Sequence, residues 1–220
     1  MNHSPTKKLV LIVEGHGDQK CLPGLVTGFL QQHDVHHVVV AGEPLNAKSC
    51  GNLKRKDGIE NFVRQAVQVR GADAVLVLLD ADKECETRSR NGERSLGPWL
   101  LERAKAIAGH KPISVVVAHR EYEAWLIAGW PEIHTMLKNR PAQFPNLKDD
   151  VISLKHSKAC EQLSGYERLL ENALGEPYVK TRHQALLTKG VSFSREMQDR
   201  SRSFRKLVKE LAALVELLKP

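Results

Sequence analysis

Short apolar runs alternate with longer amphipathic segments through the first half of the chain. Four of these runs predict strands, because they are short, rich in Val, Ile and Leu, and bounded by polar residues; they are Lys8–Val13, Val35–Ala41, Ala74–Leu79 and Ile113–Ala118. Apolar residues at helical spacing lie between them, in the segments Asp18–Gln32, Gly58–Arg70 and Pro98–Ala108. This order predicts an α/β fold with a parallel sheet of about four strands, flanking helices and right-handed crossovers.

The pattern changes after Ala118. Glu121–Ala128 and Ser157–Leu174 are predicted to be helical, whereas three prolines between residues 131 and 155 indicate irregular structure. Ser201–Leu218 is an amphipathic helix with one apolar and one basic face. We therefore expect residues 1–130 to form an α/β core and residues 131–220 to form a helical extension packed on it.

Carboxylates follow two of the predicted strands. Glu14-Gly15 follows the first, and Asp80-Ala81-Asp82 follows the third. The carboxyl ends of parallel strands share one edge of the sheet, where ligands bind, and residues two apart on an extended chain point the same way. Three acids there predict a site for a hard divalent cation, Mg²⁺ or Mn²⁺, and indicate phosphoryl transfer. Asp18 is instead predicted to cap the first helix.

Two further segments carry candidate site residues. Glu121 and Glu123 follow the fourth strand. Positions two apart diverge on a helix, so both reach the metal only if the helix begins late; the alternative is an acid-rich first turn that complements the helix dipole. Lys180 is a candidate for stabilising charge on a phosphoryl transition state, and the alternative for it is a surface lysine.

The net charge changes the expected partner. Lys and Arg number 33 against 26 Asp and Glu, which gives a formal charge of +7. An excess of positive charge favours polyanions such as nucleic acid, although it also serves solubility. Two long polar segments are predicted to rim the acidic site and contact phosphates, with solvated loops as the alternative. Their basic residues are Lys54, Arg55 and Lys56 in the first, and Arg88, Arg90 and Arg94 in the second.

Several classes of protein are disfavoured. No apolar run approaches the length of a membrane span, and Met1–Thr6 is too short and polar for a signal peptide, so we expect a cytoplasmic protein without a membrane partner. The four cysteines lie far apart in the sequence. This spacing predicts reduced cysteines without a disulfide framework or a metal site.

At this point the motifs resemble a known family. Glu-Gly after the first strand and Asp-x-Asp after the third resemble the TOPRIM domain of topoisomerases, primases and overcoming-lysogenization-defect (OLD) nucleases. The chain more closely resembles a bacterial TOPRIM-like group, domain of unknown function 4276. The matching segments are Ile12–Gly15, Leu79–Asp82, Arg120–Trp125, Tyr178–Thr181 and Ser203-Phe204.

The resemblance implies a Rossmann-like TOPRIM fold and a Mg²⁺-dependent nuclease. Its catalytic residues would be Glu14, Asp80, Asp82 and Lys180, with Glu121 and Glu123 as further metal ligands. It also implies a separate ATPase of the SMC/ABC type as partner and a role in phage defence. The sequence has no Gly-x-x-x-x-Gly-Lys-Ser/Thr loop, so we do not expect it to hydrolyse ATP itself.

Other functions stay open at this stage. The main alternative is a non-catalytic TOPRIM-like module that binds nucleic acid or regulates a partner ATPase. A phosphatase of the Asp-x-Asp kind is less favoured, because it needs a nucleophilic aspartate after the first strand, where this chain has Glu14.

Overall fold

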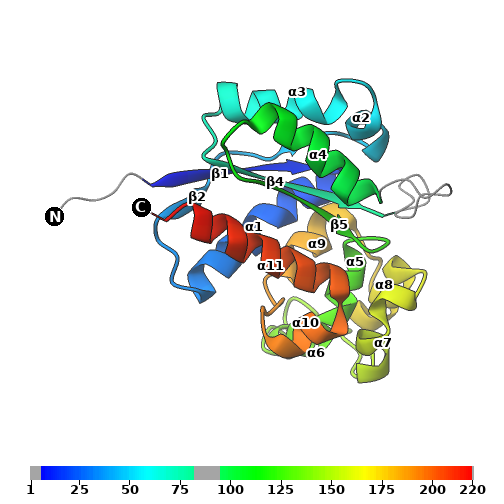
Figure 1. The fold of residues 1–220 in the computed structure, drawn as a ribbon. Helices are drawn as coiled ribbons and strands as arrows, with labels where there is room; N and C mark the ends of the chain where they lie inside the picture. The colour runs from blue at the N-terminus through cyan, green and yellow to red at the C-terminus, as the bar shows by residue number, and fades with distance from the viewer. Residues whose placement is uncertain (1–5, 82–94, 220) are drawn as a thin grey trace.

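A parallel sheet forms the centre of the computed structural model, which describes residues 6–81 and 95–219. Within these residues the sheet has five strands: β1 (Lys7–Val13), β2 (Val38–Val40), β3 (Leu45–Asn46), β4 (Ala74–Asp80) and β5 (Ile113–Ala118). Their order is β2-β1-β4-β5, and β3 pairs with β1 beyond the end of β2. All pairs are parallel, which confirms the predicted α/β class (Figure 1).

The strands are apolar on both sides because helices cover both faces of the sheet (Figure 1). Side chains alternate along each strand. Leu9, Leu11 and Val13 of β1 therefore join one hydrophobic cluster, whereas Val10 and Ile12 join a second cluster on the opposite face. This double burial explains the uninterrupted apolar runs in the sequence.

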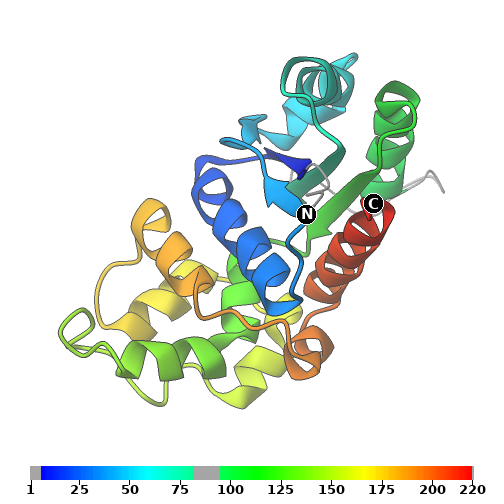
Figure 2. The ribbon, with the colours of Figure 1, turned by 90° about the vertical axis from the view of Figure 1, so that its left-hand side faces the viewer.

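Each face has its own set of helices. One face carries α2 (Cys50–Lys54), α3 (Gly58–Arg64) with its π-helical continuation Gln65–Val69, and α4 (Leu96–Ala108). The other carries α1 (His16–Gln32) and α11 (Arg202–Leu217). The remaining helices gather beside α1 and α11, away from α3 and α4 (Figure 2). They are α5 (Glu123–Ala128), α6 (Trp130–Lys138), α7 (Leu154–Lys158), a 3₁₀ turn (Cys160–Gln162), α8 (Tyr166–Leu174), α9 (Lys180–Thr188) and α10 (Arg195–Arg200).

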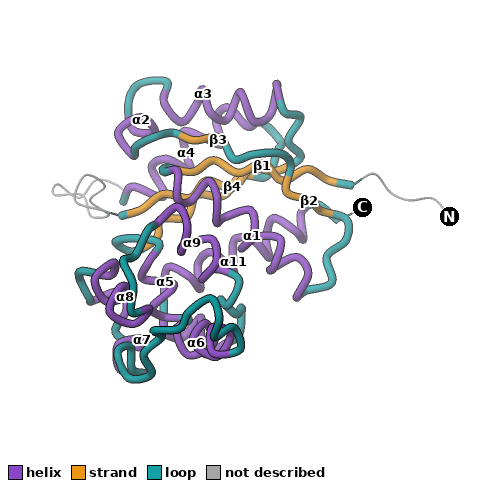
Figure 3. Tube along the Cα trace, turned by 180° about the vertical axis from the view of Figure 1, so that it is seen from behind, coloured by secondary structure: helices purple, strands orange, loops and turns teal. Residues whose placement is uncertain are grey.

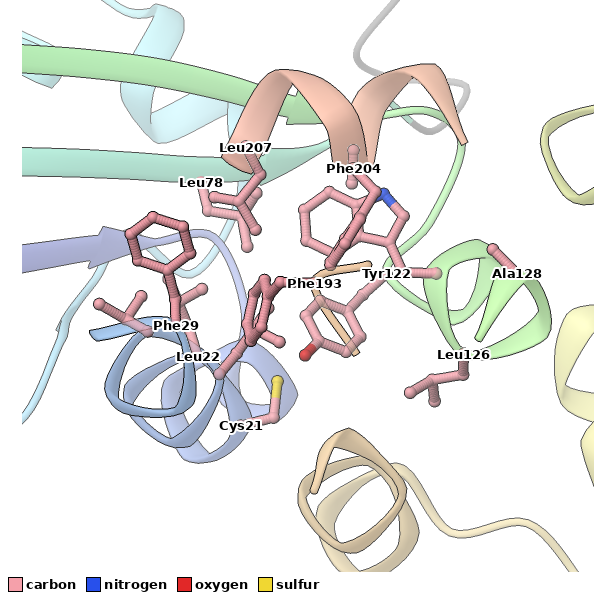
Figure 4. Packing of buried hydrophobic residues seen from close by; sticks show 14 of the residues in the cluster. Cys21, Leu22, Phe29, Leu78, Tyr122, Leu126, Ala128, Phe193, Phe204 and Leu207 are labelled. Atoms are coloured by element: carbon pink, nitrogen blue, oxygen red, sulfur yellow. The ribbon is translucent and has the colours of Figure 1, made fainter. Parts of the chain in front are cut away.

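Aromatic side chains join the two parts of the chain into one core. Phe193 lies edge-on to Phe29 of α1, at 5.4 Å between ring centroids, and stacks on Phe204 of α11 at 5.7 Å (Figure 4). Trp125 of α5 meets Phe204 edge-on at 5.6 Å. The larger hydrophobic cluster therefore contains residues from both 1–130 and 131–220. The division at residue 130 remains a prediction.

Several local predictions are wrong. Residues 131–155 were expected to be irregular, but Trp130–Lys138 is helical, because Pro131 lies in the first turn where its missing N–H is not needed. The predicted helix Ser157–Leu174 is broken, and its last part begins after Gly165, whose φ is +69°. The first of the two long polar segments, residues 43–57 with Lys54, Arg55 and Lys56, is not simply a loop, because it contains β3 and α2.

The cysteine and membrane predictions have different outcomes. Cys21 and Cys160 are free and buried, whereas Cys50 is disulfide-bonded, so the expectation of reduced cysteines is wrong for Cys50. No helix among residues 6–81 and 95–219 is long and apolar enough to cross a membrane.

The strand order fixes where a ligand can bind. From β1 the chain moves to β2 on one side of the sheet and later to β4 on the other side. Loops that leave β1 and β4 in opposite directions open a crevice at the carboxyl ends of these two strands. The sequence places Glu14 and Asp80 at that crevice.

We predict that Phe204→Ala lowers the free energy of unfolding by about 3–5 kcal/mol, because it empties a fully buried ring site between three elements. Urea denaturation measures this. The matched control on the same helix is Leu217→Ala, which removes a side chain that is 68% exposed and should change stability by less than about 0.5 kcal/mol. Equal effects of the two changes would contradict the described packing of α11.

Candidate active site

Glu14 links the ends of two strands and a helix. It follows β1 directly, and its Oε2 accepts a hydrogen bond from the backbone N–H of Asp80, at 3.0 Å. Its Oε1 accepts one from the backbone N–H of Cys50 at the start of α2, also at 3.0 Å. These bonds fix the orientation of the carboxylate at the crevice between β1 and β4.

Asp80 ends β4 and holds a buried oxygen. Its Oδ1 accepts no hydrogen bond from any residue within the described ranges. Burial raises the pKa of Asp80 well above its usual range. The negative charges of Asp18 and Glu123 raise this pKa further, and Lys180 opposes them. Such a carboxyl group is strongly stabilised by any cation that reaches it.

Glu123 is the first residue of α5 and is fully buried. Its Oε1 accepts a hydrogen bond from the Tyr178 hydroxyl at 3.0 Å. Its Oε2 accepts no hydrogen bond within the described part of the chain, although Lys180 Nζ lies 3.6 Å away. Burial raises the pKa of Glu123, against the opposing charge of Lys180.

Asp18 corrects a sequence-based interpretation. It was expected to cap the first helix, but α1 begins at His16, and Asp18 lies within its first turn and is buried. Burial raises the pKa of Asp18 from 3.8 to about 7, and the charge of Glu123 adds to this effect. Asp18 therefore belongs with Glu14, Asp80 and Glu123 in what we call the acidic cluster. In the sequence, only its position four residues after Glu14 indicated that Asp18 could join the other acids.

Glu121 lies at the edge of the acidic cluster. Arg120 has a φ of +67°, and its guanidinium donates to the Leu163 carbonyl at 2.9 Å. This turn delays the start of α5 until Glu123, which is the late start that the sequence argument required. The Glu121 carboxylate is partly buried and makes no hydrogen bond or ion pair with another described residue. Its charge nevertheless raises the pKa of Glu123.

Lys180 reaches the acidic cluster from the helical extension. Its ammonium lies 3.6 Å from both Glu123 Oε2 and Glu167 Oε1, and its side chain is 41% exposed. Burial disfavours the charged form, but Glu123 and Asp80 outweigh this and raise the pKa of Lys180 to about 12. Lys180 is therefore a permanent cation beside buried carboxyl groups.

A buried histidine holds Lys180 in place. His183 Nδ1 accepts the backbone N–H of Val179 at 2.8 Å, so the proton of the neutral ring lies on Nε2. Nε2 then donates to Glu176 Oε1 at 2.9 Å. The Tyr178 ring stacks on His183 with a centroid distance of 5.7 Å. These contacts fix the first turn of α9, from which Lys180 projects.

The predicted phosphate-binding residues have different outcomes. Lys54, Arg55 and Lys56 are exposed: Lys54 ends α2, and Arg55 and Lys56 lie in the turn before α3. Arg103 donates to the carbonyl oxygens of Lys54 and Arg55 and to both oxygens of Glu60, at 2.7–2.9 Å. The turn is thereby anchored to α4, near the carboxyl edge of the sheet (Figure 1). Four predicted site residues lie outside the described residues: Asp82, Arg88, Arg90 and Arg94.

The donor types in the acidic cluster fit a hard cation. Asp80 Oδ1 and Glu123 Oε2 are buried carboxylate oxygens without hydrogen bonds from described residues, and Mg²⁺ prefers such oxygens. However, the described residues contain no group of three or more His, Cys, Asp or Glu side chains spaced to hold a metal ion. Asp80 and Glu123 therefore each offer one candidate ligand oxygen, and the ammonium of Lys180 lies 3.6 Å from that of Glu123.

Comparison with known proteins gives one family match. The model of the family described as "Domain of unknown function (DUF4276)" matches residues 13–212. This range includes Glu14, Asp80, Glu123 and Lys180. No curated protein matches the chain significantly.

Solved structures with a similar overall path belong to OLD proteins. The C-terminal region of the Xanthomonas campestris pv. campestris OLD protein has 15% sequence identity, covers 96% of this chain and 97% of that chain, and gives a TM-score of 0.47. The C-terminal region of the Burkholderia pseudomallei OLD protein has 16% sequence identity, covers 92% of this chain and 98% of that chain, and gives a TM-score of 0.43. Similarity at this level assigns no function to the chain.

We predict that Asp18→Asn stabilises the protein at alkaline pH when divalent cations are removed. The wild-type carboxyl keeps its proton up to about pH 7 in the folded state but loses it near 3.8 when unfolded, so stability falls as pH rises between these values. Asparagine carries no charge, and at about 1.4 kcal/mol per pKa unit the gain at pH 8 is on the order of 1–4 kcal/mol, vanishing near pH 4.

Chemical denaturation across this pH range with a chelator present measures the effect. The control is Asp34→Asn, because Asp34 is exposed beyond the end of α1 and has a φ of +52°, which asparagine also adopts. If the stability of Asp18→Asn and that of the wild type changed with pH in parallel, Asp18 would not have the raised pKa that we describe.

Proposed function

The chain belongs to the DUF4276 family, and we propose that it is a metal-dependent nuclease of the TOPRIM/OLD type that cleaves nucleic-acid phosphodiesters with Mg²⁺ or Mn²⁺. One observation carries the proposal: Asp80 at the end of β4 and Glu123 of α5 each hold a buried carboxylate oxygen without a hydrogen bond from the described residues, and Glu14 after β1 is hydrogen-bonded to the backbone of Asp80. Buried charges of one sign are costly unless a cation accompanies them. A divalent cation would supply that charge.

The site residues would divide the work as follows. Asp80 and Glu123 would hold the metal, together with Asp82 and with Glu14 and Glu121 as direct or water-bridged ligands. A bound divalent cation polarises a phosphoryl oxygen and lowers the pKa of a water molecule. The ammonium of Lys180 would stabilise negative charge on the phosphoryl oxygens. Tyr178 would keep Glu123 in place through its hydrogen bond to Oε1.

The charge distribution supports a nucleic-acid substrate. The formal charge is +7, and Lys54, Arg55 and Lys56 form an exposed basic turn that Arg103 anchors near the acidic cluster. Basic side chains beside an acidic metal site suit a polyanion whose phosphate binds the metal. We extend the proposal to Arg88, Arg90 and Arg94 as phosphate contacts.

We also propose a partner protein. The 220 residues contain no Gly-x-x-x-x-Gly-Lys-Ser/Thr loop, so we do not propose that they hydrolyse ATP themselves. The resemblance of the Glu-Gly and Asp-x-Asp motifs to OLD-type nucleases makes an SMC/ABC-type ATPase the proposed partner and phage defence the proposed role.

One observation favours a second candidate function. Lys180 lies 3.6 Å from Glu123 Oε2, so an ammonium ion already stands where a metal would bind that oxygen. A site neutralised in this way suits a non-catalytic module that binds nucleic acid or regulates an ATPase. The two candidates differ in metal-dependent turnover.

We predict that purified protein cleaves nucleic acid only with a divalent cation, and that Asp80→Asn lowers the rate by roughly 10²-fold or more. The assay offers single-stranded DNA, duplex DNA and RNA with Mg²⁺, with Mn²⁺ and with chelator. Mn²⁺ should also raise the melting temperature of the wild type, but not that of Asp80→Asn.

The control for Asp80→Asn is Asp73→Asn, which removes a carboxylate at the other end of the same segment. Asp73 precedes β4, pairs with Lys7 and Lys111, and should leave the rate unchanged. Nucleic-acid binding without turnover under any metal would support the non-catalytic module instead.

We predict that Lys180→Ala lowers turnover by roughly 10²-fold, the usual effect of removing one preorganised donor, and that Lys180→Arg restores part of the rate. Loss of the ammonium also leaves the buried Glu123 carboxylate without its counter-charge, so we expect a lower melting temperature without metal, and turnover is measured well below that temperature. Lys189→Ala, an exposed lysine at the end of α9, is the control. If Lys180→Ala cleaved at the wild-type rate, Lys180 would be a surface lysine without a role in turnover.

A further inference from the structure

A second group of polar side chains lies at the carboxyl end of β3. β3 and β4 pair with β1 on opposite sides, so this group lies across β1 from Asp80 (Figure 3). With strands spaced 4.7–4.9 Å apart, the ends of β3 and β4 are separated by about 10 Å. The group consists of Asn46 from β3, His16 and Gln19 from α1, and Lys48 before α2.

The hydrogen bonds of this group determine how the Asn46 amide is oriented. Asn46 Oδ1 accepts the backbone N–H of Lys48 at 2.7 Å, which only an oxygen can do. Asn46 Nδ2 donates to Gln19 Oε1 at 3.0 Å, and Gln19 Nε2 donates to the Pro44 carbonyl at 3.1 Å. The Asn46 and Gln19 amides are thus fixed between a backbone donor, the Lys48 N–H, and a backbone acceptor, the Pro44 carbonyl.

This orientation selects one tautomer of His16. Asn46 Nδ2 lies 3.2 Å from His16 Nδ1 and can only donate, so Nδ1 accepts and the proton of the neutral imidazole lies on Nε2. His16 is exposed. No hydrogen-bond partner of Nε2 is found among residues 6–81 and 95–219. The ring therefore presents an N–H donor to the solvent, and a protonated Nε2 cannot bind a metal.

Asn46 also holds Lys48. The backbone of Lys48 has a φ of +67°, a conformation that is uncommon for residues other than glycine. The hydrogen bond from its N–H to Asn46 Oδ1 supports this conformation. The Lys48 side chain is exposed, and its ammonium forms no ion pair with a residue that the structure describes.

We propose that His16 Nε2–H, whose ring Asn46 orients, and the ammonium of Lys48, whose backbone Asn46 holds, bind a phosphate group of the nucleic acid adjacent to the phosphate at the acidic cluster. The proposal rests on the proposed nuclease function. Both groups only donate hydrogen bonds, and phosphate oxygens only accept them. The separation of about 10 Å between the ends of β3 and β4 assigns the two places to different phosphates of one strand.

Binding of a fluorescent oligonucleotide with chelator present tests the proposal without cleavage. His16→Ala should weaken binding roughly fivefold to tenfold without changing its salt dependence, because a neutral donor releases no counterion. Lys48→Ala should weaken binding to a similar extent and lower the slope of log K against log salt by about 0.7–0.9. Lys105→Ala, an exposed lysine near the end of α4, is the control.

Nitrogen NMR of the ring at mildly alkaline pH tests the role of Asn46. The wild type should show His16 protonated on Nε2. Asn46→Asp replaces the donor with an acceptor, so the proton should move to Nδ1 and affinity should fall as in His16→Ala. A wild-type ring already protonated on Nδ1 would overturn the proposed donor.

The outcomes separate this proposal from the proposed function. Wild-type affinity in both His16→Ala and Lys48→Ala, with cleavage intact, would overturn the phosphate subsite and leave the nuclease. A wild type that binds no nucleic acid either with chelator or with Mn²⁺ would overturn both. The His16 NMR signals are also titrated with inorganic phosphate. If the dissociation constant for phosphate is as low as that for the oligonucleotide, the site binds free phosphate and the proposal is wrong.

Discussion

The crowding of buried carboxyl groups at one crevice is the constraint on which the site depends. Asp18 and Glu123 are buried, and Asp80 holds a buried oxygen. The charge of Glu123 raises the pKa of Asp18, and the charges of Asp18 and Glu123 both raise the pKa of Asp80. Such carboxyl groups destabilise the fold when all are ionised without a counter-charge, and they are stable when protonated or neutralised by a cation. In the described residues, Lys180 supplies the nearby positive charge. The charge state of the site therefore depends on the cations that reach it.

The scaffold makes this crowding possible because each carboxylate comes from a rigid element. Glu14 and Asp80 are tied to each other through a hydrogen bond between strand ends, inside a sheet with apolar layers on both faces. Glu123 follows a turn that Arg120 fixes. The counter-charge comes from α9, which packs on α1 and is fixed by His183. The helical extension is thus part of the site rather than an appendage to it.

The sequence predicted what depends on local pattern. The apolar runs predicted the parallel sheet. Because Glu14 and Asp80 follow two of those runs, they were predicted to lie at the same edge of the sheet, where they are hydrogen-bonded. Asp18 was misassigned, because a helix cap and a buried first-turn acid look alike in sequence and only tertiary burial separates them. The prolines after Trp130 suggested a loop, yet Pro131 opens α6.

Contacts between distant residues could not be read from one sequence. His16 and Asn46 are separated by 30 positions and Tyr178 and Glu123 by 55. Neither pair has a distinguishing spacing. Their meeting follows from β3 pairing beside β1 and from α9 docking on α1, which are properties of the assembled fold.

The two sides of β1 are chemically complementary. On the β4 side, Asp80 and Glu123 each hold a buried oxygen without a hydrogen bond from the described residues, and a cation would stabilise their ionised forms. On the β3 side, His16 Nε2–H and the Lys48 ammonium are exposed hydrogen-bond donors that suit an anion. Since a phosphodiester strand carries anionic phosphates at regular intervals, one phosphate can share a cation with the acids while its neighbour meets the donors. Glu14 directly follows β1, the strand that lies between β3 and β4.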